Sequence, residues 1–211
     1  MVSSNIIRVE DSGFSWDVFS NEVELVQSNH EQNILDKIDS FEGSCFIDVG
    51  AHVGWWSLRA SKAFKSVISF EPHPETADLL ETNIKLNNIS NINVSRYALG
   101  NYDGNADFYV YGDRHALSSI NNFRLDWPFW KKTSVPIRRL DSFDLKTDFL
   151  KIDVEGAEQE VLDGATNTIK KHHPRILLEQ HDRKNCEKFL RDFGYEVVGI
   201  GEHLYAKISN L

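Results

Sequence analysis

The stretch FIDVGAHVG, residues 46–54, decides the fold of this 211-residue chain. An apolar run that contains Asp48 leads into two glycines, Gly50 and Gly54, and then into an amphipathic segment. Glycine adopts backbone angles that a β-carbon forbids, and a helix after such a turn directs free N–H groups toward a ligand. The stretch predicts a strand, a turn that holds a nucleotide-type cofactor, and a helix. Asp48 suits a cationic or hydroxyl-bearing cofactor, because a carboxylate accepts hydrogen bonds.

Two further predicted strands also end in acidic residues. Residues 67–71 read VISFE, so Glu71 closes a buried strand. The strand predicted over residues 149–154 carries Asp153 near its carboxyl end, and Glu155 follows it. Ligands of doubly wound folds collect at the carboxyl ends of parallel strands, where an acid that closes the second strand binds the ribose. We therefore expect the three strand ends to face one crevice, with Glu71 at a ribose.

Four motifs follow one another in the order of a known family. They are DVGAHVG at 48–54, FEPHP at 70–74, ALG at 98–100 and LKIDVEGAE at 150–158. In these motifs, across roughly residues 43–181, the chain resembles the FkbM-type S-adenosylmethionine-dependent methyltransferases. The resemblance implies a Rossmann-like class I methyltransferase fold of the α/β class: a mostly parallel seven-stranded sheet, helices on both faces and an antiparallel C-terminal hairpin. His52 and Trp55 depart from the family, which more often has Asn and a smaller residue there.

The resemblance also implies how S-adenosylmethionine would be held. The loop around Gly50 should lie against the methionine moiety, Glu71 at the ribose and the Ala98–Leu99 turn at the adenine. His73 either flanks the adenine or is a surface histidine. The expected cofactor-binding residues are Asp48, Gly50, Ala51, His52, Gly54, Glu71, Pro72, His73, Ala98, Leu99 and Asp153.

Acidic residues and a histidine are expected where methyl transfer would occur. Asp153, His181 and Glu155 are the candidate catalytic residues, since transfer to a hydroxyl requires removal of its proton and histidine titrates in the useful range. Asp153, Glu179 and His181 could instead hold a divalent metal, although a metal is not expected. Acids there can also simply favour the amino terminus of the next helix, and we prefer this interpretation for Glu158.

Strand and helix patterns alternate along the chain, which predicts a parallel sheet with helices on both faces. We expect a single methyltransferase domain, 1–211, in four parts: an arm and helix (1–42), a cofactor-binding half (43–100), an insertion or lid (101–140) and the C-terminal half of the sheet (141–211). One expected helix begins at about residue 31 and forms the last part of the arm. Further helices are expected over 55–64, 74–86, 157–171 and 183–193. Expected strands are 45–49, 67–71, 92–98, 106–111, 134–140, 149–154, 175–180, 195–200 and 203–208.

The insertion combines basic and aromatic residues. Residues 114–139 contain six Lys or Arg and one Asp, about +5, against about −14 for the rest of the chain. Such residues can seat a sugar or base and its phosphate, or they can form a packed flap with solvated charges. The expected substrate-binding residues are Arg114, Ser118, Ser119, Trp127 and Trp130.

Composition limits the setting and the partners. The net charge of −9 argues against general binding of nucleic acid or an anionic membrane. The spacing of Cys45 and Cys186 fits neither a disulfide framework nor a zinc site. With no signal sequence or long apolar run, a soluble cytoplasmic protein is expected.

The leading functional hypothesis is O-methylation of a hydroxyl on a carbohydrate, glycan precursor or small metabolite, an acceptor class that comes from the resemblance alone. Methylation of a nucleotide or nucleic-acid end is the alternative that the basic insertion keeps open. A nicotinamide-dependent oxidoreductase is disfavoured because GAHVG lacks the GxGxxG spacing. A non-catalytic cofactor-binding module is the third possibility.

Overall fold

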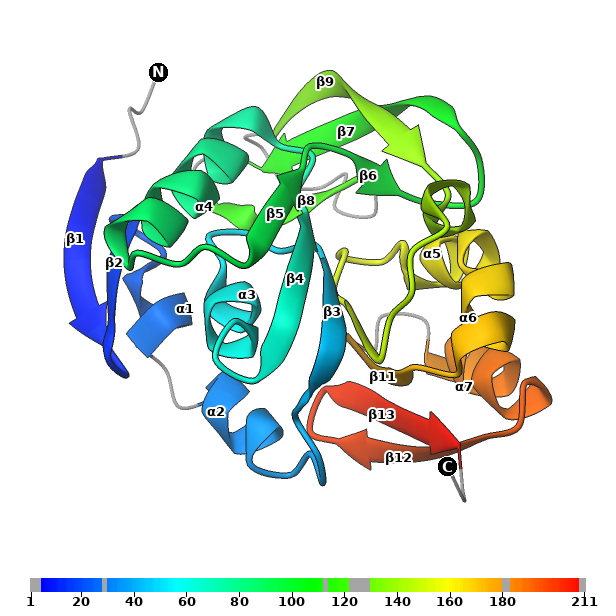
Figure 1. Ribbon diagram of the computed structural model, residues 1–211. Coiled ribbons are helices and arrows are strands. Elements are labelled where there is room, and N and C mark those ends of the chain that lie inside the picture. The colour runs from blue at the N-terminus through cyan, green and yellow to red at the C-terminus, as the bar shows by residue number, and fades with distance from the viewer. Residues whose placement is uncertain (1–4, 28–29, 112–113, 122–129, 180–182, 209–211) are drawn as a thin grey trace.

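A seven-stranded sheet forms the centre of the molecule (Figure 1). The computed structural model describes residues 5–27, 30–111, 114–121, 130–179 and 183–208. Five strands are parallel, and the last two form an antiparallel hairpin at one edge, which confirms the predicted sheet. In spatial order the strands are β12 (Tyr195–Ile200), β13 (His203–Ile208), β11 (Arg175–Glu179), β10 (Phe149–Ile152), β3 (Gly43–Val49), β4 (Phe64–Phe70) and β5 (Ile92–Ser95).

Helices cover both faces of this sheet because side chains alternate along each buried strand. In β3, Phe46 faces the core under α3 (Trp55–Ala60) and α4 (Pro74–Leu86), whereas Ile47 and Val49 face the opposite core. That second core lies under α5 (Glu158–Gly164), α6 (Thr166–His172) and α7 (Arg183–Asp192). Each fully buried side chain of this size contributes about 1.5–3 kcal/mol, so the two cores hold the layers together. Among the described helices, none is both long and apolar enough to cross a membrane.

The N-terminal arm is a β-hairpin followed by two short helices. Strands β1 (Ile6–Asp11) and β2 (Phe14–Phe19) lie beside α4, where the side chain of Asn83 both accepts from and donates to the backbone of Asp17, at 2.7 and 3.1 Å. Helices α1 (Val23–Gln27) and α2 (His30–Leu35) follow. The helical pattern of the sequence continues to Phe41, but α2 ends at Leu35, and the next segment is held by Tyr205, whose hydroxyl donates to Asp39 at 2.7 Å.

The predicted insertion (101–140), together with the short strand that precedes it, forms a second sheet above the carboxyl ends of the central strands (Figure 1). Its four strands are β6 (Ala98–Leu99), β9 (Trp130–Arg138), β7 (Gly104–Tyr111) and β8 (Arg114–Ser119), in that spatial order. Phe108 and Ile137 belong to a small core of their own between these strands. Strand β8 lies in a part of the sequence that has no clean period. After β9, the chain makes a 3-10 turn at Leu140–Phe143.

The predicted continuous helix over residues 157–171 is wrong. The chain forms α5 and α6, with a break at Ala165, whose backbone angles are φ −108° and ψ 6°. The backbone packs closely next to this break: a β-carbon on Gly164 would lie 1.9 Å from the carbonyl oxygen of Gly100. Glycine permits this contact between the end of α5 and the residue that follows β6.

Candidate active site

A cavity of about 350 Å³ lies where the ends of β3, β4 and β10 meet the inserted sheet. This volume is in the range of small-molecule sites. Its walls come from α1, the loops after these strands, the start of α3, strands β6 to β8 and the β12–β13 turn. The lining residues include Gly50, Ala51, His52, Glu71, Pro72, Ala98, Leu99, His115, Ala116, Ser118, Ser119, Lys151, Asp153, Glu155, Glu179, Glu202 and His203.

The two glycines of the first motif have different roles. Gly50 has φ +76°, and a β-carbon there would lie 1.7 Å from the carbonyl oxygen of Asp153, so glycine lets the ends of β3 and β10 meet. Gly54 has φ +102°, and its β-carbon would lie 2.5 Å from Cδ1 of Leu80 in α4. Gly50 therefore shapes the cavity, whereas Gly54 lets the start of α3 pack on α4 and is not part of the cavity wall.

Glu71 presents a buried carboxylate to the cavity. Its two oxygens accept hydrogen bonds from the backbone N–H groups of His52, at 3.0 Å, and His73, at 2.9 Å. Burial raises the pKa of Glu71, against the opposing effect of His52 and these N–H groups. Each carboxylate oxygen keeps a second lone pair, so the group can still accept hydrogen bonds from two ligand hydroxyls.

A buried ion pair joins the loop after β3 to the N-terminal arm. Nε2 of His52 lies 3.2 Å from Glu22, whose other carboxylate oxygen accepts from the backbone N–H of Ala116 in β8 at 3.0 Å. Burial alone would lower the pKa of His52, but Glu22, Glu71 and Asp153 outweigh it and raise that pKa. Sequence reasoning missed Glu22, because nothing in the residues around it distinguishes it from a surface acid before a short helix.

Asp48 lies behind the cavity wall, which corrects the expectation that it contacts the cofactor directly. It is on the Phe46 face of β3, fully buried beneath α3, where the hydroxyl of Ser57 donates to it at 2.6 Å. Lys151, its partner in the paired strand, places Nζ 3.4 Å from Asp48 and 3.1 Å from Asp153. Asp48 thus positions Lys151 through an ion pair, and Lys151 in turn positions Asp153 at the cavity.

An acidic cluster forms one end of the cavity. Carboxylate oxygens of Asp153, Glu155 and Glu179 lie within 4.8 Å of one another. Burial raises the pKa of Glu179, and the charge of Asp153 raises it further, whereas Lys151 and Glu179 lower the pKa of Asp153 in spite of burial. The two pKa shifts thus favour protonation of Glu179 and ionisation of Asp153. His203 is buried beside Glu179 in the adjacent strand, and sequence reasoning did not single it out.

The remaining expectations for this end have mixed outcomes. His181 lies outside the described residues. Glu158 does not line the cavity: it is buried at the start of α5 and accepts from the backbone N–H of Gly156 at 2.9 Å, in agreement with a role at the helix terminus.

Two hydrogen bonds connect the inserted sheet and the segment after β8 to the acidic end of the cavity. The hydroxyl of Ser119 donates to the carbonyl oxygen of Val154 at 2.9 Å, and the side-chain amide of Asn121 donates to that of Gly156 at 2.7 Å. Ser118 and Ser119 line the cavity, and their role in substrate binding stays a prediction. Trp130 does not line it, but packs edge-to-face on Tyr109. Trp127 and the side chain of Arg114 lie outside the described residues.

His73 fits neither of its expected roles. It is 8% exposed and therefore not a surface histidine, and it is not part of the cavity wall. Its ring packs against His115 of β8, with ring centroids 5.0 Å apart. Burial, reinforced by His115, lowers the pKa of His73 to about 4.

Comparison with known proteins identifies the family. The sequence model of the methyltransferase FkbM domain matches residues 48–197, which include the glycine turn, Glu71 and the acidic cluster. The chain belongs to the FkbM methyltransferase family. "Methyltransferase 1" of Beauveria bassiana (strain ARSEF 2860) is 28% identical to this FkbM chain over 170 residues, or 68% of this chain and 67% of the relative.

Solved structures share the fold of this FkbM methyltransferase. FkbM from Methylobacillus flagellatus KT has a TM-score of 0.58 at 19% identity; the match covers 80% of this chain but only 44% of that one, so the chain spans less than half of its length. TYW2 of M. jannaschii, solved in complex with AdoMet, has a TM-score of 0.54 at 13% identity, with 98% and 85% of the two chains covered. At these identities the structures support the fold, and family membership supports methyl transfer.

Proposed function

We propose that this methyltransferase uses S-adenosylmethionine and transfers its methyl group to a hydroxyl of a carbohydrate, glycan precursor or small metabolite. The observation that carries the proposal is Glu71, a buried carboxylate with free lone pairs at the end of β4, in the wall of a cavity that Gly50 also shapes. In a doubly wound sheet this position suits a ribose.

The residues of the cavity fit such a cofactor. Glu71 would accept hydrogen bonds from the ribose hydroxyls, and the loop of Gly50, Ala51 and His52 would lie against the methionine moiety. The adenine would contact Ala98, Leu99 and Pro72, which give the cavity an apolar side. The positive charge of the sulfonium and the amino group would be balanced by Asp153, whose lowered pKa keeps it ionised.

The acidic end of the cavity is the proposed site of transfer. S-adenosylmethionine supplies an already activated methyl group, so the protein mainly has to hold an acceptor oxygen in line with it. Asp153 would orient the acceptor hydroxyl, with Glu155 beside it. Because a carboxylate of low pKa is a weak base, His181 remains the proposed general base. The ammonium group of Lys151 lies 3.1 Å from Asp153, and its positive charge opposes the binding of a divalent cation in this cluster.

Replacement of Glu71 tests cofactor binding. Loss of a charged hydrogen-bond acceptor costs about 1.5–3 kcal/mol, so Glu71→Ala should weaken S-adenosylhomocysteine binding about tenfold or more in calorimetry. Glu24→Ala, a change of an exposed acid in α1, is the matched control and should bind normally. Unchanged affinity in a folded Glu71→Ala protein would refute the assignment.

An acceptor screen tests the second part of the proposal. Labelled S-adenosylmethionine should transfer its methyl group to hydroxyl-bearing sugars or small metabolites rather than to RNA. Transfer to RNA alone would favour the alternative of nucleic-acid methylation. If a folded protein binds the cofactor but no acceptor of any class is methylated, the non-catalytic interpretation gains support.

A further inference from the structure

We propose that His73, Glu75 and His115 form a binding site for a late first-row divalent metal ion such as Zn²⁺, separate from the acidic cluster. The three residues come from two parts of the fold: His73 and Glu75 lie at the start of α4, and His115 lies in β8 of the inserted sheet. One potential ligand atom of each lies within 4.8 Å of the other two. Two imidazoles and one carboxylate are a ligand set that zinc accepts.

The relative placement of the two histidines fits a shared ion. Their ring centroids are 5.0 Å apart, and their planes are inclined by 31°. Two imidazoles that bind one tetrahedral ion through nitrogen at 2.0–2.1 Å also have ring centroids about 5 Å apart.

The surroundings of the histidines resemble the outer shell of a metal site. Nδ1 of His73 is 2.9 Å from the hydroxyl of the buried Thr76, so Nε2 remains for an ion and the ring orientation is fixed. Phe19 stacks on His115 with ring centroids 4.1 Å apart, and the ring of Phe108 is nearly parallel to that of His73 with centroids 6.3 Å apart. These aromatic rings keep both imidazoles in place.

Glu75 provides the route to solvent. Unlike the two histidines, it is exposed, so its side chain can turn toward an ion that enters from outside, and water can fill the fourth position. An ion held in this way would tie β8, which lines the cavity, to the start of α4, which follows the Glu71 motif. The proposed effect is to fix the inserted sheet over the cavity.

Zinc titration of the protein without an affinity tag tests the site. Calorimetry should show one Zn²⁺ per chain, and thermal unfolding should shift upward with Zn²⁺ because the ion binds the folded state. Co²⁺ should give the visible absorption of a site with imidazole ligands. His115→Ala should weaken Zn²⁺ binding 100-fold or more, and Glu75→Gln about tenfold, in line with the loss of a metal ligand.

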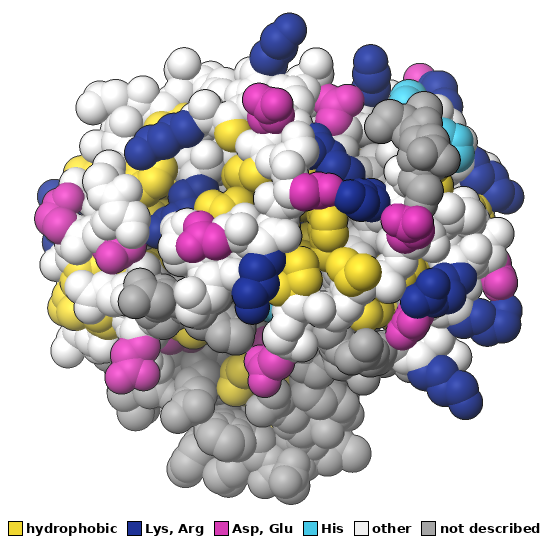
Figure 2. Space-filling model, turned by 90° about the horizontal axis from the view of Figure 1, so that it is seen from below, with side chains coloured by type: hydrophobic (Ala, Val, Ile, Leu, Met, Phe, Trp, Pro, Cys, Tyr) yellow, Lys and Arg dark blue, Asp and Glu magenta, His cyan; other side chains and the backbone are white. Residues whose placement is uncertain are grey.

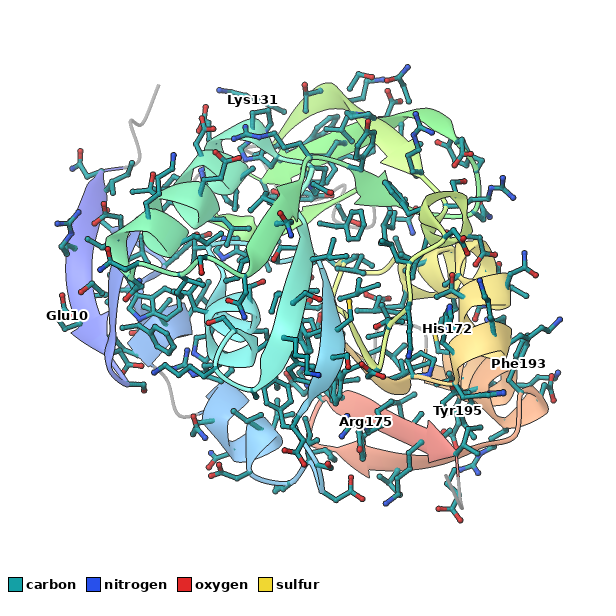
Figure 3. All side chains as sticks on the ribbon, viewed as in Figure 1. Glu10, Lys131, His172, Arg175, Phe193 and Tyr195 are labelled. Carbon is teal, nitrogen blue, oxygen red and sulfur yellow. The ribbon has the colours of Figure 1, made fainter. Side chains whose placement is uncertain are left out.

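Three variants make the test decisive. Glu75→Gln changes an exposed residue, so it remains informative if His115→Ala does not fold. His172→Gln, in α6 (Figure 3), removes a histidine remote from the cluster and should leave Zn²⁺ binding unchanged. Zinc binding that Glu75→Gln does not alter, or that Glu155→Gln abolishes, would overturn the proposal, as would the absence of binding at millimolar Zn²⁺.

Discussion

At the scale of single residues, the pair of Glu22 and His52 connects parts of the molecule that are distant in sequence. The carboxylate of Glu22 accepts a hydrogen bond from the backbone N–H of Ala116 in the inserted sheet, and the backbone N–H of His52 donates to Glu71. The histidine at position 52 thus has a buried acid as its partner. The pair should make the stability of the loop after β3 depend on pH.

The direction of this dependence follows from the two pKa shifts. Because the pKa of His52 is raised in the folded state, its contribution is complete below pH 6.5 and is lost as the pH rises through the folded value. The pKa of Glu22 is lowered, although burial opposes this, so its contribution is present above pH 4.5 and is lost on acidification. The pair should stabilise the fold most between these two values.

Glu22→Gln is therefore expected to lower the free energy of unfolding by about 1–3 kcal/mol at pH 6, and by less at pH 9. Urea unfolding at both pH values measures this difference. Glu24→Gln, in the exposed part of α1, should have little effect at either pH. An equal loss for Glu22→Gln at both pH values would show that the ion pair does not contribute.

Gly50 gives a second prediction at this scale, with Gly194 as its internal control. Both have positive φ, but nothing lies within 4 Å of a β-carbon on Gly194. Gly194→Ala should therefore cost only the conformational penalty of about 1–2 kcal/mol. Gly50→Ala also collides with the backbone at Asp153 and should cost about 1–3 kcal/mol more. Thermal unfolding compares the two, and equal costs would contradict the close approach of β3 and β10.

At the scale of elements, β8 and the loop after β10 form two sides of the acidic end. Ser119 and Asn121 bind the carbonyl groups of this loop, in which Glu155 has φ +54° and Gly156 has φ +95°. Residues other than glycine occupy positive φ at a cost, so surrounding contacts must hold Glu155 there. The end of β8 supplies such contacts.

Asn121→Ala is expected to reduce stability by about 0.5–1.5 kcal/mol and to lower turnover more than S-adenosylhomocysteine affinity. The reason is that the side-chain amide of Asn121 donates to Gly156 in the loop of the proposed transfer site and does not contact the Glu71 side of the cavity. Steady-state kinetics and calorimetry separate the two effects, with Asn105→Ala on the exposed face of β7 as control. Equal losses in turnover and affinity would argue against this division of the cavity.

Local sequence patterns correctly predicted the bounds of elements whose ends are set by residues at those ends. Helix α4 has the predicted bounds, since Pro74 begins it, and β12 and β13 also match. The hairpin β1–β2 was missed, although the alternation of Phe14, Trp16 and Val18 and the turn at Gly13 are local signals of paired strands. The motifs indicated Glu71 and Asp153, whereas Glu22, His115 and His203 reach the site through tertiary packing that no local pattern records.

At the scale of the whole molecule, charge is mixed rather than separated. Residues 101–140 contain six basic and four acidic residues, and Lys132 and Arg139 pair with Asp107 and Asp103 at 3.0 and 3.6 Å. Figure 2 shows Lys and Arg interspersed with Asp and Glu over the face seen from below. Lys131 points outward from the inserted sheet (Figure 3). The basic stretch of the sequence is thus partly neutralised by acids of the same sheet.

Weak binding of nucleic acid is the corresponding prediction. With a net charge of −9 and these pairs, single-stranded RNA should bind with a dissociation constant above about 10⁻⁴ M at physiological salt, the weak limit for non-specific binding. Fluorescence anisotropy with a labelled oligonucleotide measures it. Micromolar binding that weakens steeply with salt would instead support an acceptor that is a nucleic-acid end.

The pairing of β3 with β10 also sets the order in which the molecule can be built. These neighbours at the centre of the sheet lie about a hundred residues apart in the chain, and such non-local pairs form slowly. On the ribosome, β3 and β4 emerge long before β10, so the hydrophobic edge of β3 stays open while the inserted sheet is synthesised. Open strand edges promote aggregation of incomplete chains. Nascent-chain intermediates that end before Phe149 should therefore depend on chaperones more than the finished protein does.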